Sequence, residues 1–256
     1  MDEGGYGWGN AGIQNLNGDL TSRFGAIGFK GNLASKRTSQ LRYYGDVLVT
    51  DAEVNVTGHR AEVTRVRLGM ESAFQISQGI RPFLDANVRQ DGGDADTGIG
   101  LELGGGLRIA YPKWNLRGEV RSQGLVLHSA DGFTEWGISG SIELGNPSEG
   151  FIMRVRPSWG PTHHGSFYRQ QTIFNSTSLR SGMHRTELEL GYGFPVSSGT
   201  ARSIVGVTQL PQGRLLRLGG ELRPWNQVSF SVSGLTHHHQ GSRFDMSVNI
   251  QGTLRY

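Results

Sequence analysis

The sequence contains no cysteine, which excludes disulfide-stapled scaffolds and metal sites built from thiolates. It has no apolar run approaching the ~18 residues of a membrane-spanning helix. The first residues, from Met1 to Gly5, form neither a basic nor an apolar segment, so the sequence predicts no signal peptide. If the protein is a membrane protein, we expect it to cross with strands, and we expect this chain to be a fragment or a mature piece.

Lysine is nearly missing as well. Only Lys30, Lys36 and Lys113 occur among 25 basic residues, and the formal net charge is +3. The arginines stand one at a time and alternate with carboxylates, so no basic stripe for nucleic acid is predicted. Because a guanidinium is weakly hydrated and pairs with carboxylates in a bidentate manner, this pattern favours an enclosed polar network.

Glycine, in contrast, is abundant. The chain has 40 glycines, while its hydrophobic residues make up only 36%. The glycines follow no three-residue period, and an aromatic content of 9% argues against disorder. A fold that uses glycine inside its regular elements is therefore expected.

Apolar and polar residues alternate along most of the chain, as in "GIGLELGGGLRIAY". There Leu101, Leu103 and Leu107 share one face of a strand, while Glu102 and Arg108 share the other. About fourteen such segments occur, most near the ~9–11 residues that a tilted strand needs to cross a bilayer. Glu102 is then acceptable because its neighbours face lipid while it faces a polar interior.

The breaks between these segments are of two kinds that alternate along the chain. Short breaks are predicted at Pro112–Lys113, Gly145–Glu149, Val196–Thr200 and Trp225–Gln227, and longer polar ones at Thr50–Arg60, Arg89–Thr97, His128–Thr134, Pro161–Ser181 and Thr236–Phe244. Short turns at one end and long loops at the other are typical of an outer-membrane barrel. We predict one all-β domain over residues 1–256, a closed antiparallel transmembrane barrel of 12 to 14 strands with both termini on the turn side. Residues 1–19 hold a poorly defined first strand, and the pattern is clearest over 20–256.

The lumen of this barrel would be lined by the charged residues of the polar face. These are Arg65, Arg67, Glu71, Glu102, Arg108, Arg117, Glu119, Arg121, Arg154, Arg156, Glu187, Glu189, Arg217 and Glu221. Glu102 is expected to pair with Arg108 or Arg121. A soluble β-sandwich also alternates, but there lysine would be common and glycine would be confined mainly to turns. The apolar face carries aromatic residues near strand ends, as interfacial girdles require.

Four segments carry a family resemblance: "RVRLGMESAF" from Arg65, "IRPFLDANVRQDGGDADTGIGLELGGGLRIAYP" from Ile80, "LRGEVRSQGLVLHSADGFTEWGISGSIEL" from Leu116 and "MRVRPSWG" from Met153. They resemble the C-terminal β-barrel domain of autotransporter-type proteins, over about Leu20 to Tyr256. The resemblance implies a bacterial outer-membrane barrel that anchors, and can help to export, an N-terminal passenger absent from this chain. It also implies membrane lipid and the barrel assembly machinery as partners, and Gly252, Leu254 and Tyr256 as the C-terminal assembly signal, with tyrosine where phenylalanine is more usual. No cofactor is implied.

Other functions leave weaker signals. "GIGLELGGG" has Leu103 where a dinucleotide loop requires glycine. His163–His164 and His237–His239 fall in predicted outer loops and lack further metal ligands. A hydrolase at the barrel rim could use Asp91, Asp94, Asp96, His128 and Asp131, but no nucleophile spacing supports it, so no enzyme is predicted. The remaining alternative is a small porin, in which the lumen arginines line an anion path; we favour a reading of these residues as a lumen-filling salt-bridge web.

Overall fold

The computed structural model describes residues 5–16, 20–36, 38–55, 57–94, 97–130, 135–146, 149–160, 184–197, 199–210, 213–225, 228–239 and 245–255. Nearly all of them lie in strands. Among the described residues, no helix is long and apolar enough to cross a membrane.

Fourteen strands follow one another in the chain. They are β1 (Tyr6–Leu16), β2 (Leu20–Ser35), β3 (Ser39–Val54), β4 (His59–Phe74), β5 (Ile80–Gly93), β6 (Gly98–Tyr111), β7 (Leu116–His128), β8 (Glu135–Gly145), β9 (Gly150–Trp159), β10 (His184–Val196), β11 (Gly199–Leu210), β12 (Gly213–Trp225), β13 (Val228–His239) and β14 (Asp245–Arg255), with the 3-10 turn η1 (Pro112–Trp114) between β6 and β7.

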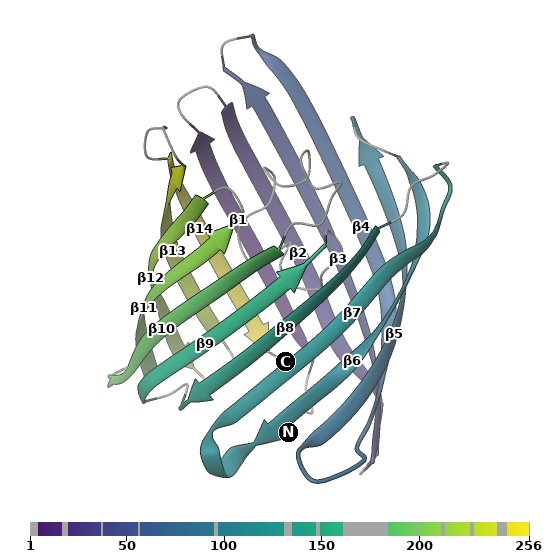
Figure 1. The fold of residues 1–256 in the computed structure, drawn as a ribbon, viewed down its shortest axis with the longest axis vertical. Coiled ribbons are helices and arrows are strands. Elements are labelled where there is room, and N and C mark those ends of the chain that lie inside the picture. Colours follow the sequence, from purple (N-terminus) through teal and green to yellow (C-terminus); the bar gives the residue numbers. More distant parts are fainter. Residues whose placement is uncertain are drawn as a thin grey trace.

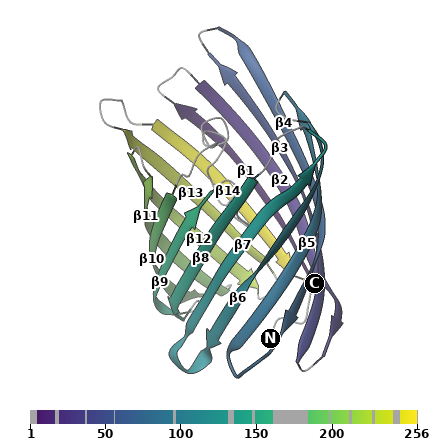
Figure 2. The same cartoon turned by 45° about the vertical axis from the view of Figure 1, so that its right-hand side comes forward.

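Each strand pairs with its sequence neighbours, and β1 pairs with β14, so the sheet closes into a barrel (Figures 1 and 2). The closing ladder runs antiparallel from Tyr6 opposite Arg255 to Asn15 opposite Met246. The prediction of an all-β, antiparallel fold is confirmed. Figure 1 places both termini at the same end of the barrel, which we call the terminus end; the opposite end, where β9 stops at Trp159 and β10 starts at His184, is the loop end.

The first strand is better defined than the sequence suggests. β1 forms a complete ladder with β2, from Tyr6 opposite Lys30 to Leu16 opposite Leu20. Its outward positions include Gly7, Gly9 and Ala11, which are too small to give an apolar alternation. On the inner face, Trp8 of β1 covers Gly28 of β2, where a Cβ would lie 2.4 Å from the Trp8 ring.

Two of the predicted long loops, Thr50–Arg60 and Arg89–Thr97, are mostly strand, and Thr236–Phe244 begins as strand. β3 continues to Val54 and β4 begins at His59, β5 continues to Gly93, and β13 continues to His239. The polar residues of these stretches pair across the hairpin instead of forming a loop. Arg60, for example, lies 3.7 Å from the Asp51 carboxylate and 3.6 Å from that of Glu53. Polar composition alone therefore misplaced the strand ends. The predicted short breaks agree with the strand ends, as at Tyr111 and Leu116.

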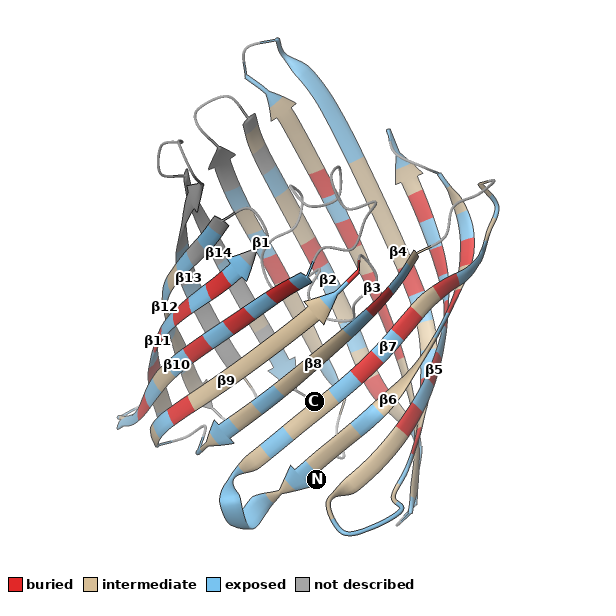
Figure 3. Cartoon of the chain, in the orientation of Figure 1, coloured by how far each residue is buried: buried red, intermediate tan, exposed pale blue. Residues whose placement is uncertain are grey.

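The outer and inner faces of the barrel wall carry different residues, as the alternation along the sequence predicts. Large apolar side chains point outward and are exposed, among them Leu84, Leu103, Leu188 and Leu218 at 67%, 47%, 41% and 57%. The charged residues between them are buried, and Figure 3 shows buried and exposed positions alternating along β5 and β10. The barrel therefore has an apolar outside and a charged inside, the reverse of a protein that folds around an apolar core.

Aromatic residues gather on the outer face near the strand ends. At the terminus end these are Phe29, Tyr43, Trp114, Phe151, Tyr192 and Phe194, and at the loop end Trp136 and Trp159. Some of them cover glycines of the next strand: a Cβ on Gly31 would lie 2.4 Å from the Tyr43 ring. An aromatic ring over a strand glycine restores the packing that the glycine lacks.

Candidate functional site

In the described part of the chain, ionisable side chains are concentrated over an extended area only on the inner face of the barrel. No group of three or more potential metal ligands occurs among the described residues. The residues instead form three ion-pair clusters, centred on Glu71, Arg89 and Glu189, and a smaller group around Glu221.

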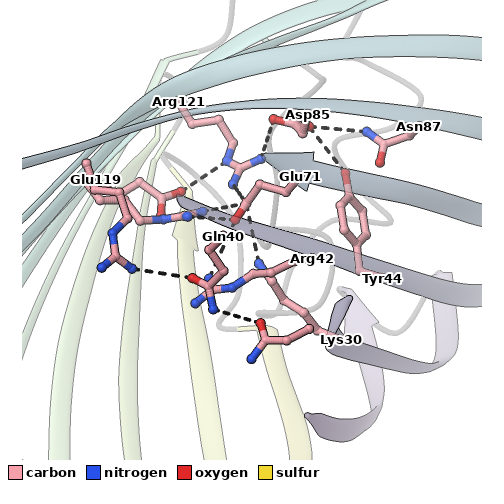
Figure 4. Close-up of polar contacts among 12 residues, drawn as sticks. Lys30, Gln40, Arg42, Tyr44, Glu71, Asp85, Asn87, Glu119 and Arg121 are labelled. Atoms are coloured by element: carbon pink, nitrogen blue, oxygen red, sulfur yellow. Dashed lines mark hydrogen bonds and ion pairs between the residues drawn. The ribbon is translucent and has the colours of Figure 1, made fainter. Parts of the chain in front are cut away.

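The Glu71 cluster lies toward the terminus end, on β2 to β7. The Glu71 carboxylate is fully buried and is surrounded by four cations (Figure 4). Arg108 binds both of its oxygens, at 2.8 and 2.6 Å. Arg121 lies at 3.0 Å, Lys30 at 3.5 Å and Arg42 at 3.6 Å. A single carboxylate thus ties together five strands.

Two further carboxylates and one aromatic ring complete this cluster. Arg121 also binds Asp85 at 2.9 Å and Glu119 at 3.1 Å. The guanidinium carbons of Arg108 and Arg121 lie 4.0 and 4.3 Å from the centre of the buried Phe83 ring. Stacking on an aromatic face suits a planar guanidinium and holds it in one orientation.

Glycines on the inner face of β6 make room for these long side chains. A Cβ on Gly104 would lie 2.8 Å from the Asp85 carboxylate, and one on Gly106 would lie 2.7 Å from the Phe83 ring and 2.0 Å from the Val120 carbonyl oxygen. This accounts for Gly104 and Gly106 in the run "LELGGGL": Asp85 and Phe83 of β5 occupy the space that their side chains would need.

The Arg89 cluster lies nearer the loop end. The fully buried Arg89 binds Glu102 at 3.0 Å, Asp91 at 2.5 Å and Glu135 at 2.5 Å. Glu102 also accepts a hydrogen bond from Gln123 at 2.9 Å. In the same cluster, Arg67 forms a bidentate pair with Asp46, with both hydrogen bonds at 3.0 Å. Arg65 binds Asp91 at 2.6 Å.

The expected partners of Glu102 were wrong. It pairs with Arg89 and, at 3.9 Å, with Arg67, whereas Arg108 and Arg121 bind Glu71 and Glu119. The reason is register: Glu102 lies opposite Asn87, two residues from Arg89, while Arg108 lies opposite Arg81 at the far end of the same strand. Partners are set by the strands on each side, and their register is not visible in the spacing along one strand.

The Glu189 cluster occupies the wall formed by β8 to β12. Glu189 is bound by Arg154 at 2.6 Å, Arg156 at 2.9 Å and Arg217 at 3.0 Å. Arg154 also binds Glu143, and Arg156 binds Glu187 at 2.5 Å. Farther toward the terminus end, Glu221 is shared by Arg202 at 3.2 Å and Arg223 at 2.6 Å.

The inner-face residues named from the sequence therefore take part in these clusters, with one exception. Arg117, near the terminus end of β7, is exposed and makes no ion pair among the described residues. Several cluster members were not among the lumen residues predicted from the sequence: Lys30, Arg42, Asp46, Phe83, Asp85, Arg89, Asp91, Glu135, Glu143, Arg185, Arg202 and Arg223. All have the inward parity of their strands, so the same alternation would have found them.

A β-bulge brings two residues of the rim-hydrolase set, His128 and Asp91, close together on the inner face. Between β6 and β7 the register shifts so that Leu101 faces Leu127 but Glu102 faces Leu125. The shift turns His128 inward, where its Nε2 lies 3.5 Å from the Asp91 carboxylate. Asp94 instead accepts a hydrogen bond from the Glu62 backbone N–H at 2.8 Å.

The other candidates give no site that can be described. Asp96, Asp131 and His163–His164 lie outside the described residues. His237 to His239 were expected in an outer loop, but they belong to β13, where His239 pairs with Gly213. Of the proposed C-terminal signal, Gly252 and Leu254 lie in β14 with Leu254 exposed on the outer face, and Tyr256 lies outside the described residues.

Comparisons with known proteins agree on architecture alone. No protein-family model matches the chain, and no curated protein matches it significantly. Among solved structures, an outer membrane channel from Pseudomonas putida F1 is similar with a TM-score of 0.58 and 7% identity, over 100% of this chain and 96% of that one. The beta domain of the Bordetella autotransporter BrkA aligns with a TM-score of 0.49 and 13% identity, over 100% and 99% of the two chains. The KdgM porin aligns with a TM-score of 0.47 and 8% identity, over 98% and 99%. Only the first of these three similarities is strong enough to support a conclusion about the fold. It shows that this chain shares the β-barrel fold of an outer membrane channel.

Proposed function

We propose that this chain is a bacterial outer-membrane barrel whose lumen conducts small solutes. The apolar, exposed outer face and the aromatic residues near both ends support a location in lipid, because a bilayer solvates such a face and water does not. Closure supports it as well, since a closed barrel leaves no unpaired strand edge in hydrocarbon.

The reach of the ion pairs supports a conducting lumen. In the described residues no ion pair joins strands more than three places apart in the ring of fourteen; the longest are Arg121 on β7 with Glu71 on β4, and Arg89 on β5 with Glu135 on β8. The facing strand is seven places away. Between the described side chains, the ion pairs therefore run along the wall of the barrel, which supports a conducting lumen.

The size of the ring agrees with this. Fourteen strands spaced about 4.8 Å apart and tilted by about 40° enclose a backbone cylinder roughly 28 Å across. An arginine side chain extends about 7 Å from the wall, so two facing arginines would leave roughly 14 Å between them.

Single-channel recording in planar lipid bilayers tests this proposal. The purified chain, folded in detergent, should insert and give stable conductance steps. Replacing the exposed inner-face arginine, Arg117→Glu, should change the step size, because a charge in the lumen alters the local ion concentration. The matched variant Arg214→Glu, on an exposed outward residue, should leave the step unchanged. A folded barrel that inserts without conducting would overturn the channel proposal.

Anchoring of an N-terminal passenger is the second candidate, and the autotransporter-like segments from Arg65 to Gly160 favour it. In that case β14 and its Gly252 and Leu254 would serve recognition by the barrel assembly machinery, and the barrel would conduct almost nothing. A coding sequence upstream of Met1 that specifies a signal peptide and a repetitive β-rich region would support the anchor.

A further inference from the structure

The inner-face charges are distributed unevenly along the barrel. Among the inner-face side chains that the structure describes, those in the half within five residues of the terminus end of each strand comprise nine cations and five anions: Lys30, Arg42, Arg81, Arg108, Arg117, Arg121, Arg154, Arg202 and Arg223 against Glu71, Asp85, Glu119, Glu143 and Glu221. In the other half the charges balance: Arg65, Arg67, Arg89, Arg156, Arg185 and Arg217 against Asp46, Asp91, Glu102, Glu135, Glu187 and Glu189. Of the described side chains, the excess of four positive charges therefore lies in the terminus half.

Two of these cations make no ion pair among the described residues, and a third shares its carboxylate with three other cations. Arg81 hydrogen-bonds to the amide oxygens of Gln40 and Gln75, at 3.5 Å each, and makes no ion pair among the described residues. Arg117 is exposed and likewise makes none in that part of the chain. Arg42 is one of four cations around the single Glu71 carboxylate. Neutral hydrogen-bond acceptors hold an arginine in place without cancelling its charge.

We propose that the terminus half of the lumen selects small anionic solutes. This proposal rests on the proposed channel function. Fixed positive charge inside a low-dielectric wall focuses the field and raises the local anion concentration. The range of this field suits the lumen, because the Debye length is about 10 Å at 0.1 M salt and about 3 Å at 1 M. Exposed guanidinium groups would recognise carboxylate, phosphate or sulfonate groups through paired hydrogen bonds.

The reversal potential between chambers of unequal KCl concentration measures this selectivity. The unaltered protein should pass chloride in preference to potassium, with a permeability ratio above one. The double variant Arg81→Gln/Arg117→Gln should lose roughly half of the excess over one, because it removes two of the four excess charges. Neither residue makes an ion pair in the described structure, so folding, checked by heat-modifiable migration, should be unchanged.

A matched double variant controls for the loss of two charges anywhere on the protein. Arg60→Gln/Arg214→Gln removes two exposed, outward-facing arginines near the loop end and should leave the ratio unchanged. The preference should also weaken at about 1 M salt, where screening shortens the field.

The outcomes separate the inference from the function on which it rests. A folded, inserted protein without conductance would refute the channel itself. A conducting protein with a ratio at or below one, or a ratio that the lumen double variant does not change, would refute anion selection while the channel stands.

Discussion

Replacing Glu71 with glutamine is expected to lower the free energy of unfolding by about 3–5 kcal/mol, because removing one partner of a buried ion pair leaves uncompensated charge. The Glu71 side chain has no exposed surface, and four cations from β2, β3, β6 and β7 converge on it. Glutamine retains the shape but cannot offset the mutual repulsion of Lys30, Arg42, Arg108 and Arg121. Urea titration of the detergent-folded barrel, followed by tryptophan fluorescence, measures the loss.

The matched control makes the same substitution where the pair is exposed. Glu53 pairs with Arg60 near the loop end, with side chains 36% and 60% exposed. Glu53→Gln should change the free energy of unfolding by no more than about 0.5 kcal/mol, as exposed ion pairs contribute little. Equal losses for the two variants would mean that the Glu71 cluster is not the point at which these strands are held together.

Placing arginine on the outer face at Leu84 is expected to cost about 2–4 kcal/mol, the penalty for a cation on the lipid face near the middle of the bilayer. Leu84 is 67% exposed and lies in the first half of β5, some four residues from the terminus-end turn. A strand needs about 9–11 residues to cross a bilayer, so this position falls near its middle.

Ile76 provides a control of equal exposure outside the lipid. It is 69% exposed and lies in the turn between β4 and β5. Ile76→Arg should cost only about 0–1 kcal/mol, since the penalty falls off near the interface. If water surrounded the barrel, two positions of such similar exposure should tolerate arginine equally well. Equal, small effects in refolded vesicles would contradict a lipid-facing outer surface.

The sequence was most informative about sidedness. In β6 the alternation of Leu101 and Leu103 with Glu102 correctly separates the outer face from the inner one, because side chains on a strand alternate without exception unless a bulge intervenes. The turn at Pro112–Lys113 was also predictable, since proline fixes φ and cannot continue a ladder.

Register and bulges were not predictable from the same pattern. The partner of Glu102 depends on how β5 is aligned against β6, and no single strand encodes that alignment. The bulge between Leu125 and Leu127 brings His128 to the inner face, and nothing in "GLVLH" marks the extra residue. β1 was poorly defined because Gly7, Gly9 and Ala11 leave its outer face without the large apolar residues on which the pattern depends.

Accessibility measured residue by residue along β8 tests the lipid-facing outer surface most directly. The native chain has no cysteine, so single cysteines at positions 138 to 142 can each carry a nitroxide label without background. Ile138, Gly140 and Ile142 should show high collision rates with oxygen, which concentrates in lipid, and Ser139 and Ser141 with a water-soluble paramagnetic reagent. Two faces equally accessible to the water-soluble reagent, or an outer face shielded from both reagents, would contradict the barrel in lipid.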